Sequence, residues 1–324
     1  MGMVMRRHLM ATALGAGLVT VTGMPAEAAS ATRFGVIAST QGPPSDDADT
    51  FRRLYAEQRE LYGGGPIGIR LFAGGRLPLP GERNMVGTLL TWAAERHPEE
   101  TITISHKTRD DGRLRALLDW AGEHRVRLSV IYFHEVQDDW GRRRDPRAAP
   151  DVYLGTYRAY RRIVDAHPAR TRTSLEKNLM WYWQHYHAGK RGADWSEFVE
   201  RDDPADVVSW DTYVFPGMPP DQGRYATPDE FFRYPHAVWR TTGRPWAVGE
   251  IGTTVRGDAA RFVGWVRTIT AAAADPGRIS PDYAGMPPAR FMKWWAGPDA
   301  AGNEQGLQQV PAAVDVYRRL VAAG

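Results

Sequence analysis

Two glutamates, each at the carboxyl end of an apolar run, are the residues of this sequence best placed to do chemistry. Glu135 ends the run 127–135 (RLSVIYFHE), and Glu250 ends the run 245–250 (PWAVGE). We predict that both runs are strands, and the carboxyl ends of parallel strands meet at one face of a barrel. Two carboxylates that face each other across a cleft can cleave a glycosidic bond, because one protonates the leaving oxygen while the other attacks the anomeric carbon.

The elements that must position these glutamates alternate between short β-rich runs and longer segments of helical periodicity. This alternation predicts parallel strands joined by crossover helices. We expect eight strands, at 33–39, 67–72, 101–106, 127–135, 177–183, 207–213, 245–250 and 289–295. Eight such units predict an α/β protein with a single (β/α)8 TIM barrel over residues 31–324. An open doubly wound sheet is the alternative, but no glycine-rich phosphate loop follows the first strand.

Other polar and aromatic side chains fall at the predicted carboxyl ends of the strands, and we expect them to bind the substrate. They are Arg70, His106, His134, Trp183, Asp211, Tyr213, Trp294 and Trp295. Burial beside residues 131–133 is expected to raise the pKa of Glu135, so that this carboxyl holds a proton. Arg70 and the Tyr213 hydroxyl are expected to keep Glu250 ionised.

A glutamate after the fourth strand and another after the seventh resemble the retaining glycoside hydrolases of clan A, which are built on (β/α)8 barrels. Within that clan three features are similar to glycoside hydrolase family 26, the β-mannanase family: His134 before Glu135, DVVSWDTY at 206–213 and PWAVGEIGTT at 245–254. The resemblance implies that Glu135 is the acid/base and Glu250 the nucleophile. It further implies that His134 positions the acid/base, that Tyr213 hydrogen-bonds the nucleophile, and that Trp294 or Trp295 floors the sugar site.

Composition narrows the remaining functions. The net charge of +3 on 324 residues is small, and the charges are interspersed, so we expect no nucleic-acid partner. The absence of cysteine excludes disulfides, a thiol nucleophile and an iron–sulfur cluster. No Gly-x-Ser-x-Gly elbow and no His-Glu-x-x-His motif is present. We therefore expect a cofactor-free, metal-free monomer whose partner is a carbohydrate.

Residues 1–30 are predicted to be an export signal peptide. Arg6 and Arg7 precede an apolar stretch at 9–24, and the small-residue site Ala26-Glu27-Ala28 follows it. The stretch is short and weakly apolar for a membrane span. We therefore expect a secreted, extracellular protein with no membrane contact after cleavage, exported by a general or a twin-arginine route.

Two other functions stay open from the sequence. A barrel of the same ancestry that has lost catalysis could act as an exported carbohydrate-binding protein. A metal-dependent hydrolase could use His106, His134, Asp211 and Glu250 as ligands. The distance between the two carboxyl groups bears on this choice, because retaining enzymes place them roughly 5 to 5.5 Å apart.

Overall fold

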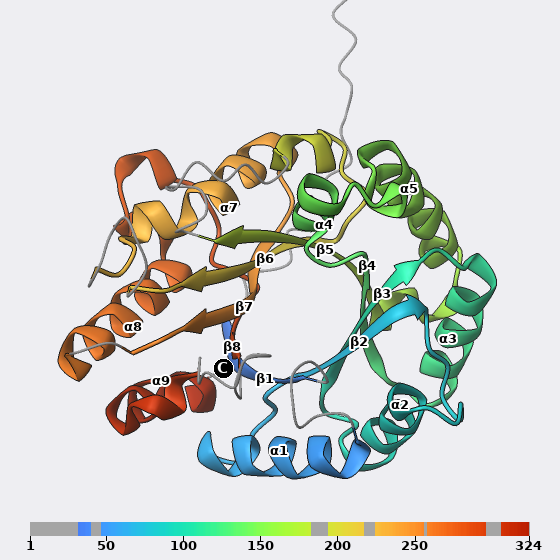
Figure 1. Cartoon of the computed structure of the whole chain (residues 1–324), viewed down its shortest axis with the longest axis horizontal. Helices are drawn as coiled ribbons and strands as arrows, with labels where there is room; N and C mark the ends of the chain where they lie inside the picture. Colours follow the sequence, from blue (N-terminus) through green and yellow to red (C-terminus); the bar gives the residue numbers. More distant parts are fainter. Residues whose placement is uncertain are drawn as a thin grey trace, which may run out of the picture.

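A computed structural model describes residues 32–39, 47–182, 194–216, 224–255, 258–295 and 306–323. Within them, eight parallel strands form a closed barrel in chain order, and helices surround it (Figure 1). The predicted (β/α)8 TIM barrel is confirmed. The export signal predicted at residues 1–30 lies outside the described residues and stays a prediction.

The strands are β1 (Arg33–Ser39), β2 (Ile69–Arg76), β3 (Thr101–Thr108), β4 (Arg127–Tyr132), β5 (Thr173–Tyr182), β6 (Val207–Val214), β7 (Trp246–Thr253) and β8 (Phe291–Trp295). The helices of the described residues are α1 (Ala48–Leu61), α2 (Met85–Arg96), α3 (Asp111–Glu123), α4 (Val136–Arg143), α5 (Pro150–Asp165), α7 (Pro228–Thr242), α8 (Ala259–Ala274) and α9 (Pro311–Ala323). Short 3-10 helices are η1 (Pro146–Ala148), η2 (Pro168–Arg172), η3 (Trp195–Phe198), η4 (Pro276–Arg278), η5 (Pro281–Tyr283) and η6 (Leu307–Gln309).

Several strands end at other residues than predicted, and this changes where the site lies. β4 ends at Tyr132, so Glu135 belongs to the turn that follows the strand. β7 continues to Thr253, so Glu250 lies inside the strand and not at its end. Arg70 is the second residue of β2. An apolar run in the sequence indicates which residues are buried, whereas backbone hydrogen bonding sets where a strand ends. The two disagree where polar side chains line the barrel interior.

Helix starts are fixed by side chains that satisfy the free amide groups of the first turn. Asp47 and Asp110 accept such amide hydrogen bonds at the starts of α1 and α3. Thr227 and Glu230 form a reciprocal capping box at the start of α7. These caps define where each crossover leaves its loop and turns back along the barrel.

The main hydrophobic core lies between the outer face of the strands and the surrounding helices. Leu117 of α3 and Tyr153, Tyr157 and Tyr160 of α5 are fully buried there. The Tyr157 hydroxyl donates to the backbone oxygen of Glu176 on β5 at 2.6 Å, which ties α5 to the barrel. Burying an apolar side chain such as a leucine contributes about 1.5–3 kcal/mol, so this layer supplies most of the stability.

The barrel interior is polar, in contrast to the core outside it. Barrels of this class commonly fill their interior with layers of branched apolar side chains. Here, buried polar side chains from β2 to β6 take those positions: Arg70, Thr103, Ser105, Ser129, Glu176, Asn178, Ser209 and Asp211. Each of these groups needs a partner, since an unpaired buried polar group is costly.

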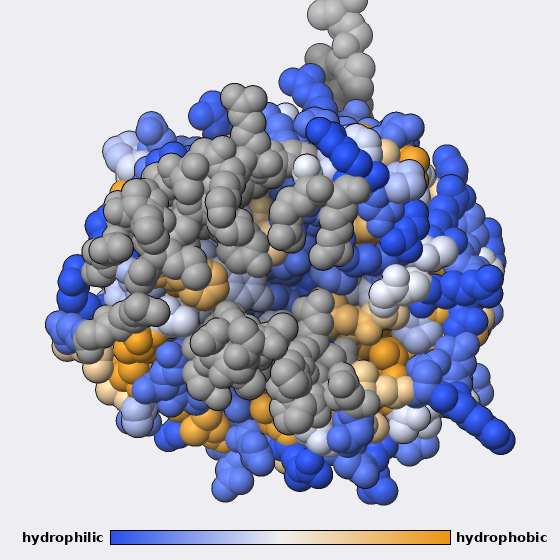
Figure 2. All heavy atoms as spheres, viewed as in Figure 1, coloured by the Kyte–Doolittle hydropathy of each residue, from blue (hydrophilic) through white to orange (hydrophobic). Residues whose placement is uncertain are grey.

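Hydrophilic side chains dominate the outer rim of the face in view, and hydrophobic ones form small scattered groups (Figure 2). Val152 is the one large hydrophobic side chain exposed among the described residues. None of the described helices is long and apolar enough to span a bilayer. The expected monomeric state stays a prediction.

Candidate active site

Three carboxylates meet inside the barrel. One oxygen each from Glu135, Asp211 and Glu250 lies within 4.8 Å of the others. Asp211 and Glu250 stand opposite each other in the register of β6 and β7. Glu135 reaches the same point from the turn after β4. The two glutamates predicted from the sequence are therefore brought together.

The guanidinium of Arg70 lies between two of these carboxylates. It donates to both oxygens of Asp211 at 3.0 and 3.1 Å, and its Nη1 lies 2.7 Å from Oε1 of Glu250. Arg70 and Asp211 are almost completely buried. They form an ion pair beside Glu250, and the expectation that they bind substrate stays a prediction. Removing a guanidinium from water is expensive, and the two carboxylates provide the compensating charge.

Glu250 is held at both oxygens. The Tyr213 hydroxyl donates to its Oε2 at 2.5 Å, as predicted. Burial raises the pKa of Glu250 to about 8; Arg70 opposes that rise, Asp211 adds to it, and the hydrogen bond from Tyr213 lowers it. Arg70 and Tyr213 therefore favour the charged form as expected, but burial outweighs them. The expectation that they keep Glu250 ionised stays a prediction.

Glu135 lies in a strained turn. Its φ is 55° and that of Phe133 is 54°, both in the left-handed region that costs residues with a Cβ about 1–2 kcal/mol each. Gln137 holds the turn in place, because its side chain accepts from the backbone nitrogen of Met180 on β5 at 3.0 Å and donates to the oxygen at 3.4 Å. Strain that the surrounding structure maintains is concentrated at functional sites.

The carboxyl of Glu135 differs from that of Glu250 in its partners. Burial raises the pKa of Glu135 well above its usual range, and the nearby Asp211 and Glu250 raise it further. Its side chain forms no hydrogen bond with any other residue in the described parts of the chain. The predicted rise in the pKa of Glu135 is confirmed in direction. Glu135 is the carboxyl of the site best suited to carry a proton.

His134 packs directly behind this turn. Its Nδ1 lies 2.6 Å from the hydroxyl of Ser105 on β3, and its ring meets Phe72 of β2 edge-on at 4.9 Å. Burial, with Lys107 and Arg70 nearby, holds the pKa of His134 well below its usual value, so the ring is neutral. This contact set fits the positioning role that the family resemblance implies.

His106 and Trp294 point away from the site, so the prediction that they bind substrate is wrong. His106 stacks on Tyr160 of α5 at 5.7 Å, and Trp294 packs edge-on against Trp265 of α8 at 5.9 Å. Side chains alternate between the two faces along a strand, so the interior positions fall to neighbouring residues.

Trp295, the last residue of β8, is the tryptophan on the interior side of that strand, two residues beyond Lys293. It is nearly fully buried. It therefore keeps its place as a candidate sugar-stacking residue. Trp183, also predicted to bind substrate, lies outside the described residues.

Asn178 and Gly249 belong to the site but are not among the predicted residues. Asn178 donates to Asp211 at 2.8 Å and accepts from Arg70 at 3.1 Å. The register shifts after Trp210, so Gly249 is an additional residue, and a Cβ there would lie 2.7 Å from Oδ1 of Asp211. An asparagine and a glycine within otherwise apolar strands were the available signals.

The four residues proposed as ligands in the metal-dependent alternative do not converge on one point. His106 faces α5, and the Arg70 guanidinium already supplies the positive charge between Asp211 and Glu250. Three clustered carboxylates suit a divalent cation in general. Here a cation would have to approach two of them against the repulsion of Arg70.

No family model and no curated relative matches the sequence. Similar solved structures are (β/α)8 glycoside hydrolases of clan A, at low sequence identity. A broad-specificity endoglucanase from Clostridium longisporum has a TM-score of 0.55 and 10% identity, covering 90% of this chain and 96% of that chain. A fungal β-1,4-galactanase has a TM-score of 0.53 and 10% identity, covering 90% and 100%. An endo-β-1,4-mannanase of Cellulomonas fimi has a TM-score of 0.50 and 14% identity, covering 91% and 71%.

These likenesses show the fold, and they do not separate family 26 from the other families of the clan. The assignment of roles to the carboxylates therefore depends on the geometry of this chain.

Glu250→Gln and Glu230→Gln should change the pH dependence of the free energy of unfolding in opposite directions. The pKa of Glu250 rises from 4.5 to about 8 on folding, so its contribution is present at low pH and is lost as the pH rises through this window. Relative to the unsubstituted protein, Glu250→Gln should therefore become more stable between about pH 5 and about pH 8, measured by urea unfolding.

Glu230 on α7 is the control, because Arg224 lowers its pKa to about 2. The ionised Glu230 stabilises the fold above about pH 4.5, and this stabilisation is lost as the pH falls toward about 2. Glu230→Gln should therefore be less stable than the unsubstituted protein at about pH 8. A stability difference for Glu250→Gln that stays constant across this range would contradict the raised pKa.

Gly249→Ala should disturb the carboxylate network. The added Cβ would meet Asp211 at 2.7 Å and Asn178 at 3.0 Å, and both side chains are fixed by hydrogen bonds. We expect a loss of about 1–3 kcal/mol in the free energy of unfolding, measured with urea. Gly264→Ala on α8, where nothing lies within 4 Å, should be neutral or stabilising. Equal effects of the two substitutions would show that the space at Gly249 is not needed.

Proposed function

We propose that the protein is a retaining glycoside hydrolase that cleaves β-glycosidic bonds of a polysaccharide or oligosaccharide. The supporting observation is the separation of Glu135 and Glu250, whose nearest oxygens lie within 4.8 Å on a (β/α)8 barrel. Retaining enzymes place their carboxyl groups roughly 5 to 5.5 Å apart, whereas inverting enzymes leave roughly 6.5 to 9.5 Å for a water molecule. The short separation favours the covalent route.

In the first step, a carboxylate oxygen of Glu250 attacks the anomeric carbon as the glycosidic bond breaks. Glu135 gives its proton to the departing oxygen, and an ester links the sugar to Glu250. In the second step, Glu135 takes a proton from water, whose oxygen attacks the same carbon. The ester bond breaks, and Glu250 regains its negative charge. The configuration at the anomeric carbon is retained because it is inverted twice.

The two glutamates suit these roles because their partners differ. Tyr213 and Arg70 contact Glu250 and favour its ionised form, which is the form that attacks. Glu135 has neither partner, and its raised pKa favours the protonated form, which is the form that donates. The productive state has one proton in the pair, on Glu135.

The proposed substrate rests on the resemblance to glycoside hydrolase family 26. His134 before Glu135, together with the motifs on β6 and β7, favours family 26, so a β-mannan is the first substrate to test. Trp295 and Trp183 are proposed to stack on the sugar. A higher activity on another β-glycan would contradict both the assignment to family 26 and the β-mannan substrate.

Covalent trapping tests the proposed nucleophile. A 2-fluoro glycosyl fluoride of the best sugar, identified on mannan, mixed-linkage glucan, xylan and galactan, should leave a sugar that peptide mass spectrometry locates on Glu250. Glu250→Gln and Glu135→Ala should each lower kcat/KM at least about 1,000-fold. Glu230→Gln, a control outside the barrel, should keep full activity.

Loss of less than about tenfold in either variant would refute the assignment. Saturable oligosaccharide binding without turnover by the unsubstituted protein would instead identify the inactive, carbohydrate-binding barrel.

The pH profile tests the charge on Glu250. We expect a bell-shaped kcat/KM whose acidic limb is displaced upward from 4.5 toward about 8, because burial stabilises the protonated form of Glu250. Tyr213→Phe removes a hydrogen bond to the charged form and should move this limb to higher pH. Tyr283→Phe, whose hydroxyl bonds Asp229 on α7, should leave the limb in place. A limb near 4.5, or one that Tyr213→Phe moves downward, would contradict this account.

A further inference from the structure

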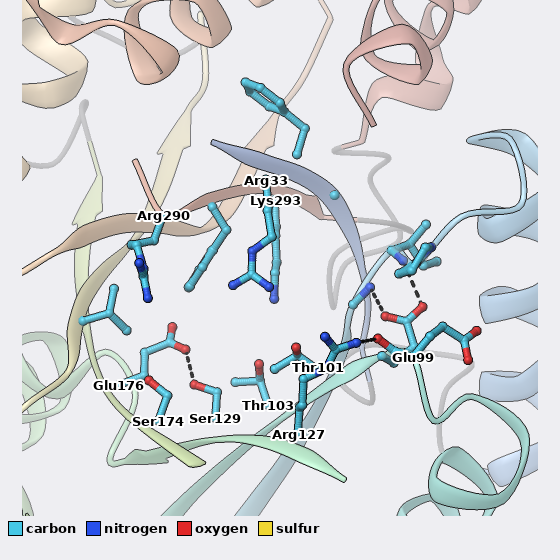
Figure 3. A pocket seen from close by; sticks show the side chains of 18 of the residues that line it. Arg33, Glu99, Thr101, Thr103, Arg127, Ser129, Ser174, Glu176, Arg290 and Lys293 are labelled. Atoms are coloured by element: carbon cyan, nitrogen blue, oxygen red, sulfur yellow. Dashed lines mark hydrogen bonds between the residues drawn. The ribbon is translucent and has the colours of Figure 1, made fainter. Parts of the chain in front are cut away.

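A cavity opens at the amino-terminal end of the barrel, away from the candidate active site. Its volume is about 370 Å³, and the first residues of several strands line it. Arg33, Arg290 and Lys293 project from the β1 and β8 side toward Glu176 and Ser129 on the opposite wall (Figure 3). Neither the carboxylate pair nor Tyr213 contributes to this cavity.

Three of the cations around the cavity have no carboxylate partner among the described residues. Arg33, Arg127 and Lys293 form no ion pair with any residue in the described ranges. The contacts of Arg127 include the backbone oxygen of Glu99. The Nζ of Lys293 lies 4.7 Å above the ring of Phe291.

The carboxylates that line the cavity are already engaged by other groups. Both oxygens of Glu176 accept from serine hydroxyls, Ser129 at 2.6 Å and Ser209 at 2.5 Å. The oxygens of Glu100 accept from the Tyr55 hydroxyl and from two backbone amides. Glu99 pairs with Arg59, and Asp206 pairs with Arg161 and Arg170. Among the described residues, none of these carboxylates forms an ion pair with Arg33, Arg127 or Lys293.

Like charges crowd this end of the barrel. Burial lowers the pKa of Arg33, and the neighbouring Arg290 and Arg127 lower it further. Burial also lowers the pKa of Lys293; Glu176 opposes this, and Arg33 and Arg70 add to it. An anion between these side chains would relieve the repulsion and favour their charged forms.

We propose that this cavity binds a small organic anion, a carboxylate or phosphate monoester with an apolar body, independently of the glycosidase site. Arg33 and Lys293 would contact its charged group. Phe34, Phe291 and Val207 would contact its apolar part. The volume is in the range of small-molecule pockets, which begin at about 300 Å³.

Calorimetric titration of the full-length protein with benzoate, phenyl phosphate and neutral benzamide tests the proposal. We expect one of the two anions to bind, and benzamide to bind at least about tenfold more weakly, because a charge-assisted contact is lost. A preference for benzoate would identify a carboxylate ligand, and a preference for phenyl phosphate would identify a phosphate ester.

Arg33→Gln and Lys293→Met should each weaken anion binding at least about tenfold. Arg52→Gln, which removes an arginine on α1 paired with Asp49, should leave binding unchanged. Glu250→Gln should also keep it, which separates this cavity from the candidate active site.

The proposal would be overturned if neither anion bound at concentrations up to about 10 mM, or if Arg33→Gln and Arg52→Gln bound the anion equally. Should Lys293→Met not fold, Arg33→Gln still decides the outcome, because Arg33 lines the cavity and its side chain is only partly buried.

Discussion

The buried guanidinium of Arg70 is the constraint on which the site depends. It bonds both oxygens of Asp211 and lies 2.7 Å from Glu250, so it joins β2, β6 and β7 across the barrel. Without it, two carboxylates would lie close together in a site from which water is largely excluded. Breaking such a buried pair costs about 3–5 kcal/mol, because the remaining charge is uncompensated. The same guanidinium therefore supports both the fold and the charge state of Glu250.

A polar barrel interior imposes requirements that an apolar one does not. A buried polar group needs a partner at hydrogen-bond distance. This requirement restricts the position of the backbone more tightly than the filling of space does in an apolar core. Asn178 bridges Arg70, Asp211 and Ser209, and the extra residue Gly249 leaves room for that bridge. The register between β6 and β7 shifts at this point, and the shift places Glu250 opposite Asp211.

The sequence was sufficient for the barrel and for the two glutamates, because strand periodicity and the carboxyl-end rule act locally. It was insufficient where a choice depends on which neighbour faces inward. Ser105 and His106 are adjacent, as are Trp294 and Trp295, and only the strand's orientation decides between them. Glu135 also required a turn with two left-handed residues, which no propensity predicts. Asn178 and Gly249 were missed because their role appears only when three strands are paired.

A polar layer inside the barrel separates the three carboxylates of the candidate site from the cations Arg33 and Lys293 of the amino-terminal cavity. Glu176, Ser209 and Asn178 connect the amino-terminal cavity to the site through hydrogen bonds. Glu176 and Asn178 are hydrogen-bonded to other polar side chains of this layer, and Lys293 and Arg33 face the amino-terminal opening. At the other end, Glu135 remains without a hydrogen-bond partner among the described residues. Under the two proposals, each end keeps the group that reacts or binds a ligand, and a closer pairing would have neutralised it.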